Sequence, residues 1–138
     1  MKTSQIKRSK ILHPFLISIF PILILYSQNI GRINTADLVL PLILSIVFSI
    51  SLYYIVKIIL KNSNKSAIIV SIILIILFSY GHIYYLLNDL TIDGFDIGRN
   101  RFLIPIFGIS LGIGIFGIVK SKRIFDNATS ILNVISAV

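Results

Sequence analysis

The chain has 138 residues, of which 56% are hydrophobic and 13% are charged, and its net charge is +8. This composition is too apolar for an ordinary soluble domain. The chain contains no Cys, which excludes disulfides, thiol nucleophiles and thiolate metal sites. The positive charge does not predict nucleic-acid binding, because the basic residues gather in alternate gaps between apolar runs, as membrane topology requires.

The first apolar run predicts a membrane span over about 11–30. A basic segment followed by an apolar run also describes a signal peptide, but no small-x-small cleavage site follows Leu25, so an uncleaved span is favoured. Pro14 lies in the first turn, where its missing N–H costs little. Pro21 lies inside the span and predicts a kink.

The second and third apolar runs predict spans over about 38–60 and 66–87. Asp37 is the expected N-cap of the second span. Lys57 lies near the end of the same span, where its amine can extend to the lipid headgroups. The third span is entered through the polar turn at 62–64.

The fourth run predicts a span over about 102–119, and its 18 residues are near the lower limit for crossing about 30 Å of hydrocarbon. Gly108 and Gly112 have the small-xxx-small spacing that lets two helices approach closely. We expect them in a helix–helix seam, either within the bundle or between two copies. The alternative is the ordinary tolerance of membrane helices for Gly.

The last segment, 127–138, opens with polar residues that can begin a helix and continues into an apolar run. It is either an interfacial amphipathic helix or the first part of a fifth span. We favour the fifth span, because no polar or capping residue closes the run. The sequence therefore predicts one all-α domain over 1–138, a polytopic integral membrane helix bundle with four transmembrane helices and a partial fifth.

The charged residues are divided unequally between the two sides of these spans. Ten of the 13 basic residues lie before the first span, from the end of the second span to the start of the third, or after the fourth. The other gaps hold three arginines and four of the five acids. Short Lys/Arg-rich loops stay in the cytoplasm. We therefore expect a multi-pass protein of the cell membrane with a cytoplasmic N-terminus, whose basic loops contact anionic lipids.

The densest polar cluster lies at the outer end of the third span. His82, Tyr85 and Asp89 share one helix face by their spacing, and Arg99 and Arg101 lead into the fourth span on the same side. Ionisable groups at membrane depth are usually paired or functional, and Arg binds phosphate bidentately. The candidates for binding a lipid or phosphate headgroup are His82, Tyr85, Arg99 and Arg101. In the alternative, the acids pair with the arginines and His82 bonds a neighbouring helix.

The sequence indicates no catalytic or metal site. It contains no nucleophile set of plausible geometry, no Gly-rich phosphate loop and no metal-ligand cluster, and we expect no cofactor. His13 lies at the cytoplasmic boundary and is expected to be solvated. All acids fall in loops or at helix ends, so a proton or cation relay through the bilayer lacks carriers.

Four short segments resemble a known family. They are His13-Pro14-Phe15-Leu16, Asn29-Ile30-Gly31, Phe78-Ser79-Tyr80-Gly81-His82 and Gly98-Arg99-Asn100-Arg101-Phe102-Leu103-Ile104-Pro105. Together they resemble the N-terminal transmembrane region of large sulfatase-like hydrolases and transferases of the alkaline-phosphatase superfamily. The resemblance covers nearly the whole chain, but the extracytoplasmic catalytic domain of that family is absent here, with its metal ligands and nucleophile. The resemblance therefore implies no catalytic residue in this chain.

The leading hypothesis is a non-catalytic membrane-anchor domain. It would tether an extracytoplasmic sulfatase-like domain and present a lipid-linked anionic substrate at the outer face. The first alternative is a small accessory subunit of a larger membrane complex, docked through Gly108 and Gly112. The second is a small transporter or flippase, which the scarcity of intramembrane charges disfavours. The expected partners are membrane lipids, with a sulfatase-like domain or other membrane subunits, and no nucleic acid.

Overall fold

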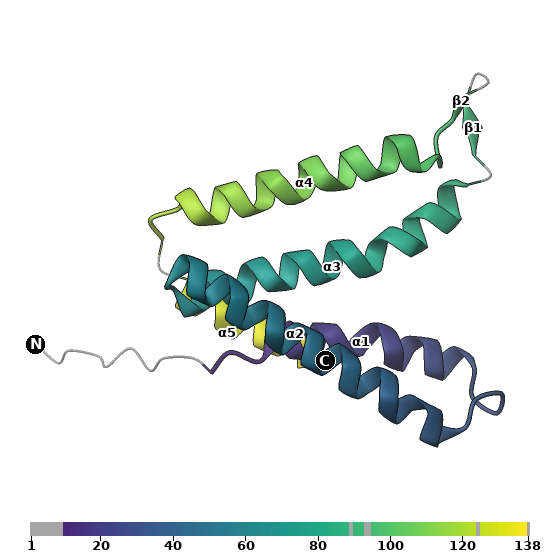
Figure 1. Cartoon of the computed structure of the whole chain (residues 1–138), viewed down its shortest axis with the longest axis horizontal. Helices are drawn as coiled ribbons and strands as arrows, with labels where there is room; N and C mark the ends of the chain where they lie inside the picture. The colour runs from purple at the N-terminus through teal and green to yellow at the C-terminus, as the bar shows by residue number, and fades with distance from the viewer. Residues whose placement is uncertain (1–9, 89, 93–94, 124, 138) are drawn as a thin grey trace, which may run out of the picture.

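The computed structural model describes residues 10–88, 90–92, 95–123 and 125–137. The described residues form five α-helices and one short hairpin (Figure 1). The helices are α1 (His13–Gln28), α2 (Val39–Leu60), α3 (Ser63–Leu87), α4 (Asn100–Lys120) and α5 (Asp126–Ala137). The hairpin pairs β1 (Thr91–Ile92) with the antiparallel β2 (Phe95–Asp96), and a 3-10 turn, η1 (Thr35–Leu38), leads into α2.

Three of the helices are long and apolar enough to cross a membrane. The stretch of η1 and α2 has a mean hydropathy of 2.3, α3 has 2.3 and α4 has 2.4. Helix α1 is also apolar, but its 16 residues extend over only about 24 Å. Large apolar side chains are exposed along all four helices, a surface that suits hydrocarbon and not water. The chain is therefore an all-α membrane helix bundle, as the sequence predicts.

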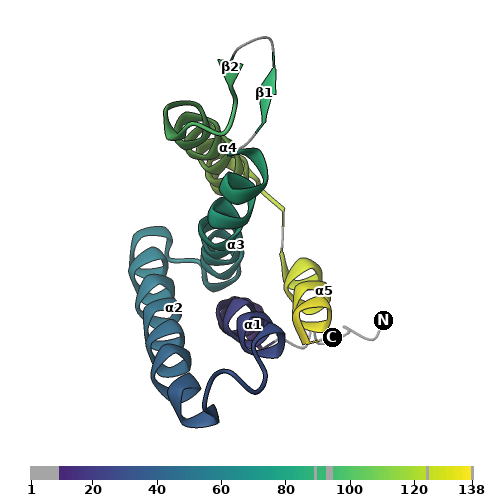
Figure 2. The ribbon, with the colours of Figure 1, turned by 90° about the vertical axis from the view of Figure 1, so that its right-hand side faces the viewer.

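Helix α3 occupies the centre of the bundle. It contacts α1, α2, α4 and α5, and Figure 2 shows it between α4 on one side and α1 and α2 on the other. The buried core joins Tyr53 of α2 to Ala67, Val70 and Leu74 of α3. The ring of Phe15, from α1, meets the Tyr53 ring edge-on with 6.0 Å between their centroids. The small side chain of Ala67 lets the helices approach closely at this point.

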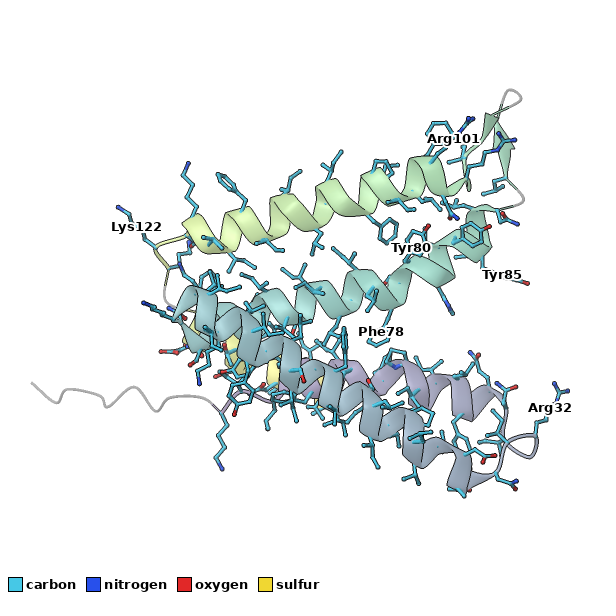
Figure 3. All side chains as sticks on the ribbon, in the orientation of Figure 1. Arg32, Phe78, Tyr80, Tyr85, Arg101 and Lys122 are labelled. Carbon is cyan, nitrogen blue, oxygen red and sulfur yellow. The ribbon has the colours of Figure 1, made fainter. Side chains whose placement is uncertain are left out.

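The helices alternate in direction, so the bundle has two distinct ends. At one end α2 and α4 finish and α3 and α5 begin; we call it the basic end because it carries Lys57, Lys61, Lys65, Lys120 and Lys122. At the opposite end α1 and α3 finish and α2 and α4 begin. Figure 3 shows Lys122 at the basic end and Arg32, Tyr85 and Arg101 at the opposite end. Three of the four basic residues that precede α1 lie outside the described residues.

Side chains at the basic end fix the ends of two helices. The Asn62 side chain caps α3 by accepting a hydrogen bond from the Lys65 backbone N–H at 3.1 Å, so α3 begins at Ser63, earlier than the expected 66. The Lys65 ammonium donates to the carbonyl oxygens of Val119 and Ser121, at 3.0 and 2.7 Å. It thereby satisfies carbonyl groups at the C-terminus of α4, where a cation is also favoured by the helix dipole.

The expectation that Asp37 caps α2 is wrong. Leu38 occupies the N-cap position of α2, with no side-chain hydrogen bond. Asp37 lies inside η1, where its backbone N–H donates to the Asn34 carbonyl oxygen at 3.0 Å. The physical reason is that the chain enters α2 through a 3-10 turn, which moves the first free N–H groups upstream of Asp37.

Candidate functional site

A cavity of about 650 Å³ lies between α1 and α3, in the halves of these helices that are nearer the opposite end. We call it the α1/α3 groove. Twelve residues line it, nine of them apolar, and the three polar ones are Gln28, Ser79 and His82. The groove exists because α1 and α3 meet at the core, which includes Ala67, and separate toward the opposite end, as Figure 1 shows.

The walls of the groove are apolar and partly open to the surroundings. Phe20 and Leu25 of α1 and Leu86 of α3 line it and are all exposed. Phe78, also in the lining, is half-buried and packs against the core, so it marks where the groove meets the closed part of the bundle. An opening with exposed apolar walls suits lipid chains better than water.

The polar residues of the groove lie toward the opposite end. Gln28 is the last residue of α1, and Ser79 and His82 are one turn apart near the end of α3. Both Gln28 and His82 are exposed, and the described residues provide neither with a hydrogen-bond partner. A primary amide and an imidazole can each donate and accept hydrogen bonds. The groove therefore combines an apolar cavity with unused polar groups at one end.

The predicted headgroup residues lie at the same end but do not form one cluster. Only His82 lines the groove. Tyr85 is 82% exposed, and Figure 3 shows it pointing away from the bundle. Arg99 precedes α4, where it is exposed, and the Arg101 guanidinium lies over the Phe102 ring at 4.7 Å.

The predicted pairing of acids with Arg99 or Arg101 falls on residues that the structure does not describe. Asp89 and Asp93 lie outside the described residues. Instead, the contact that joins α3 to α4 near this end comes from Tyr80, whose hydroxyl donates to the Asn100 side-chain oxygen at 2.7 Å. The Tyr80 ring also meets Phe107 edge-on at 5.3 Å. The described residues contain no group of three His, Asp or Glu side chains that could hold a metal ion.

The expectation that His13 is solvated is wrong. Its side chain is fully buried at the start of α1, and its Nδ1 lies 3.1 Å from the side-chain oxygen of Asn133 in α5. The same oxygen accepts hydrogen bonds from the backbone N–H groups of Leu12 and His13. Sequence reasoning missed this contact because it joins residues 120 positions apart. The one available signal was a lone amide, Asn133, within an apolar run.

The two glycines predicted to form a seam do not pack against another helix in the part of the chain that the structure describes. A Cβ added at Gly108 or Gly112 would meet no atom within 4 Å, whereas one at Gly114 would lie 3.6 Å from the Ile72 side chain. The seam within the bundle is therefore absent at Gly108 and Gly112. A seam between two copies stays a prediction.

Comparison with protein-family models, curated proteins and solved structures finds no match to this chain. The resemblance to sulfatase-like membrane regions consequently rests on the quoted segments alone.

Proposed function

We propose that this chain is a membrane-anchor domain that holds a lipid with an anionic headgroup in the α1/α3 groove. The observation that carries the proposal is a partly open apolar cavity with unused polar side chains at one end. Its volume of about 650 Å³ falls within the roughly 300–1,000 Å³ of ordinary ligand pockets. A hydrocarbon chain suits the walls, because a polar ligand would leave its own groups unsatisfied there.

The headgroup would lie at the polar end of the groove. His82 and Gln28 offer hydrogen-bond donors to a phosphate or sulfate oxygen. Arg99 and Arg101, exposed at the same end of the bundle, add positive charge that attracts an anionic headgroup. A neutral headgroup would gain the hydrogen bonds but not this attraction, so the site should prefer anionic lipids.

The charge distribution supports an orientation for this site. Because short Lys-rich loops stay in the cytoplasm, the basic end faces inward and the polar end of the groove faces the outer surface of the cell membrane. A lipid held there presents its headgroup outside the cell. This is where a sulfatase-like domain, carried by or associated with the anchor, would act on it, while the anchor itself supplies no catalytic group.

Copurifying lipid tests the proposal. The groove-blocking variant Ile24→Trp and the headgroup variant His82→Ala with Gln28→Ala should both lower the anionic phospholipid retained by the detergent-purified protein. The matched control is Ile109→Trp, which adds the same bulk on an exposed position of α4. Native mass spectrometry would count the bound lipids. Equal retention of anionic lipid by Ile24→Trp and Ile109→Trp would reject the groove as the binding site.

One observation favours the accessory-subunit alternative. Helix α4 packs chiefly on α3, and its other face carries Gly108 and Gly112 beside exposed apolar residues such as Ile109 and Ile113. Small residues on a lipid-facing surface allow a second helix to approach closely. Crosslinking of the protein in membranes would test this, because a partner subunit should crosslink through α4 and not through α1.

A further inference from the structure

Helix α5 turns two polar side chains inward and three large apolar side chains outward. Thr129 is fully buried, and Asn133 contacts the start of α1. The outward-facing Ile131, Val134 and Ile135 are 59–66% exposed. A helix packed on a protein surface in water has the reverse arrangement. The outward face of this part of α5 therefore suits hydrocarbon better than water.

The outward face of α5 also changes along the helix. Near its start, at the basic end, the exposed residues are the polar Asn127 and Ser130; only later do the apolar side chains follow. The side chain of Asp126, the first residue, accepts a hydrogen bond from the Asn64 amide near the start of α3. Figures 1 and 2 show α5 continuing from this end alongside α1. A helix that runs from the headgroups into the hydrocarbon should change in this way, from polar to apolar along its length. A helix that lies in the interface stays at one depth and should not change along its length.

The Asn133 side chain completes the hydrogen bonding at the start of α1. Its oxygen accepts from the backbone N–H groups of Leu12 and His13 at 3.0 and 2.9 Å, and its NH₂ group donates to the Lys10 carbonyl oxygen at 2.5 Å. Pro14 has no N–H to satisfy, and the next two residues donate to the Leu12 carbonyl oxygen. Every backbone N–H from Leu12 through the first turn of α1 is thus bonded.

The short α1 explains why such a cap is needed. With a length of about 24 Å, α1 cannot cross about 30 Å of hydrocarbon on its own. Because α1 finishes at the opposite end of the bundle (Figure 1), the missing length is at its start. Its first turn then begins below the membrane surface, where an unbonded N–H costs several kcal/mol because no water reaches it. A capping side chain must then come from the protein, and α5 provides it.

We infer that α5 is a membrane-inserted helix whose Asn133 side chain caps α1 within the bilayer. The twelve described residues of α5 extend over about 18 Å, enough to reach from the cytoplasmic headgroups to the middle of the hydrocarbon. Its outward stripe of Ile131, Val134 and Ile135 contacts the lipid chains of that leaflet. Asn133 is a positioning residue: it fixes α1, which in turn forms one wall of the groove.

The depth of α5 can be measured directly because the chain contains no Trp. Full-length protein carrying Asn127→Trp or Ile135→Trp would be reconstituted into phosphatidylcholine vesicles with bromine atoms at defined depths on the lipid chains. Bromines near the chain ends should quench Ile135→Trp most, and bromines near the headgroup should quench Asn127→Trp most. The same shallow profile for both variants would overturn insertion and identify an interfacial helix.

The cap is tested by hydrogen exchange in the otherwise unchanged protein. Asn133→Ala should raise the exchange rate of the backbone amides of residues 12 and 13 by about tenfold or more, because the loss of two hydrogen bonds lets the start of α1 open to water more often. The matched control Ser130→Ala removes an exposed hydroxyl from the same helix and should leave that rate unchanged. Unchanged exchange in Asn133→Ala would overturn the cap. If Asn133→Ala unfolds the protein, so that α3 also loses protection, the depth profiles still test the insertion of α5. They do so because the Trp variants leave Asn133 unchanged.

Discussion

Two leucines of α3 provide a matched test of the bundle. Leu74 is 0% exposed at the centre of the core, whereas Leu77 is 52% exposed on the same helix. Truncating either one to Ala removes the same three carbon atoms and leaves the same helix former. Any difference between Leu74→Ala and Leu77→Ala therefore measures packing against other helices.

The magnitude follows from the absence of water. In soluble proteins a buried Leu→Ala change costs about 2.7–5.0 kcal/mol, of which three carbons at about 0.8 kcal/mol each account for roughly 2.4 kcal/mol of transfer from water. In a membrane the side chain contacts hydrocarbon both before and after the helices separate, so the transfer contribution is lost. The packing contribution remains, and Leu74→Ala should cost about 0.3–2.6 kcal/mol. Leu77→Ala should cost less than about 0.5 kcal/mol.

Equilibrium unfolding in mixed micelles of mild detergent and SDS, followed by circular dichroism and Tyr fluorescence, would measure both free energies. The sign and order of the two values matter more than their absolute size. If Leu77→Ala destabilised the protein as much as Leu74→Ala, and both by more than about 0.5 kcal/mol, Leu74 would not lie in a helix–helix core and the central position of α3 would be refuted.

Three further changes test other contacts. Gly98→Ala should destabilise the bundle by about 1–3 kcal/mol, because the new Cβ would lie 2.3 Å from the backbone carbonyl oxygen of Leu87; an unchanged unfolding midpoint in the same SDS titration would contradict this close approach. Tyr80→Phe removes the hydrogen bond to the Asn100 side chain and should lower the free energy of unfolding by about 0.5–1.5 kcal/mol. An unchanged free energy of unfolding would mean that the hydroxyl is bonded to water instead. Gly108→Leu should leave the unfolding of the monomer unchanged because its surroundings are open, and a drop in stability would show that the residue packs against protein.

The sequence predicted the elements of the fold well because their signals are local. Apolar runs and the polar turn at 62–64 mark α2, α3 and α4. The positions of the lysines predict which ends of these helices lie on the same side of the membrane. The boundaries were less accurate, since Asn62 starts α3 at Ser63 and η1 displaces Asp37 from the cap of α2. Capping depends on backbone conformation over a few residues, which composition does not specify.

The site was predicted only in part because it depends on how helices meet. His82 was identified as a polar residue at membrane depth, and it does line the groove. The groove itself arises where α1 and α3 separate, a relation between segments about 60 residues apart that no motif encodes. The burial of His13 likewise depends on Asn133 in another helix. The resemblance to sulfatase-like membrane regions stays a prediction and adds no contact to the site.

Photocrosslinking of a lipid to the protein would test the central claim most directly. An anionic and a zwitterionic phospholipid, each with a photoreactive group on one acyl chain, would be compared in vesicles containing the full chain, and the labelled peptides mapped by mass spectrometry. The groove predicts that the anionic lipid labels residues 17–28 and 75–86 more than the zwitterionic lipid does, while both label 102–119 equally. Equal labelling of all three segments by the two lipids would contradict a specific lipid site between α1 and α3.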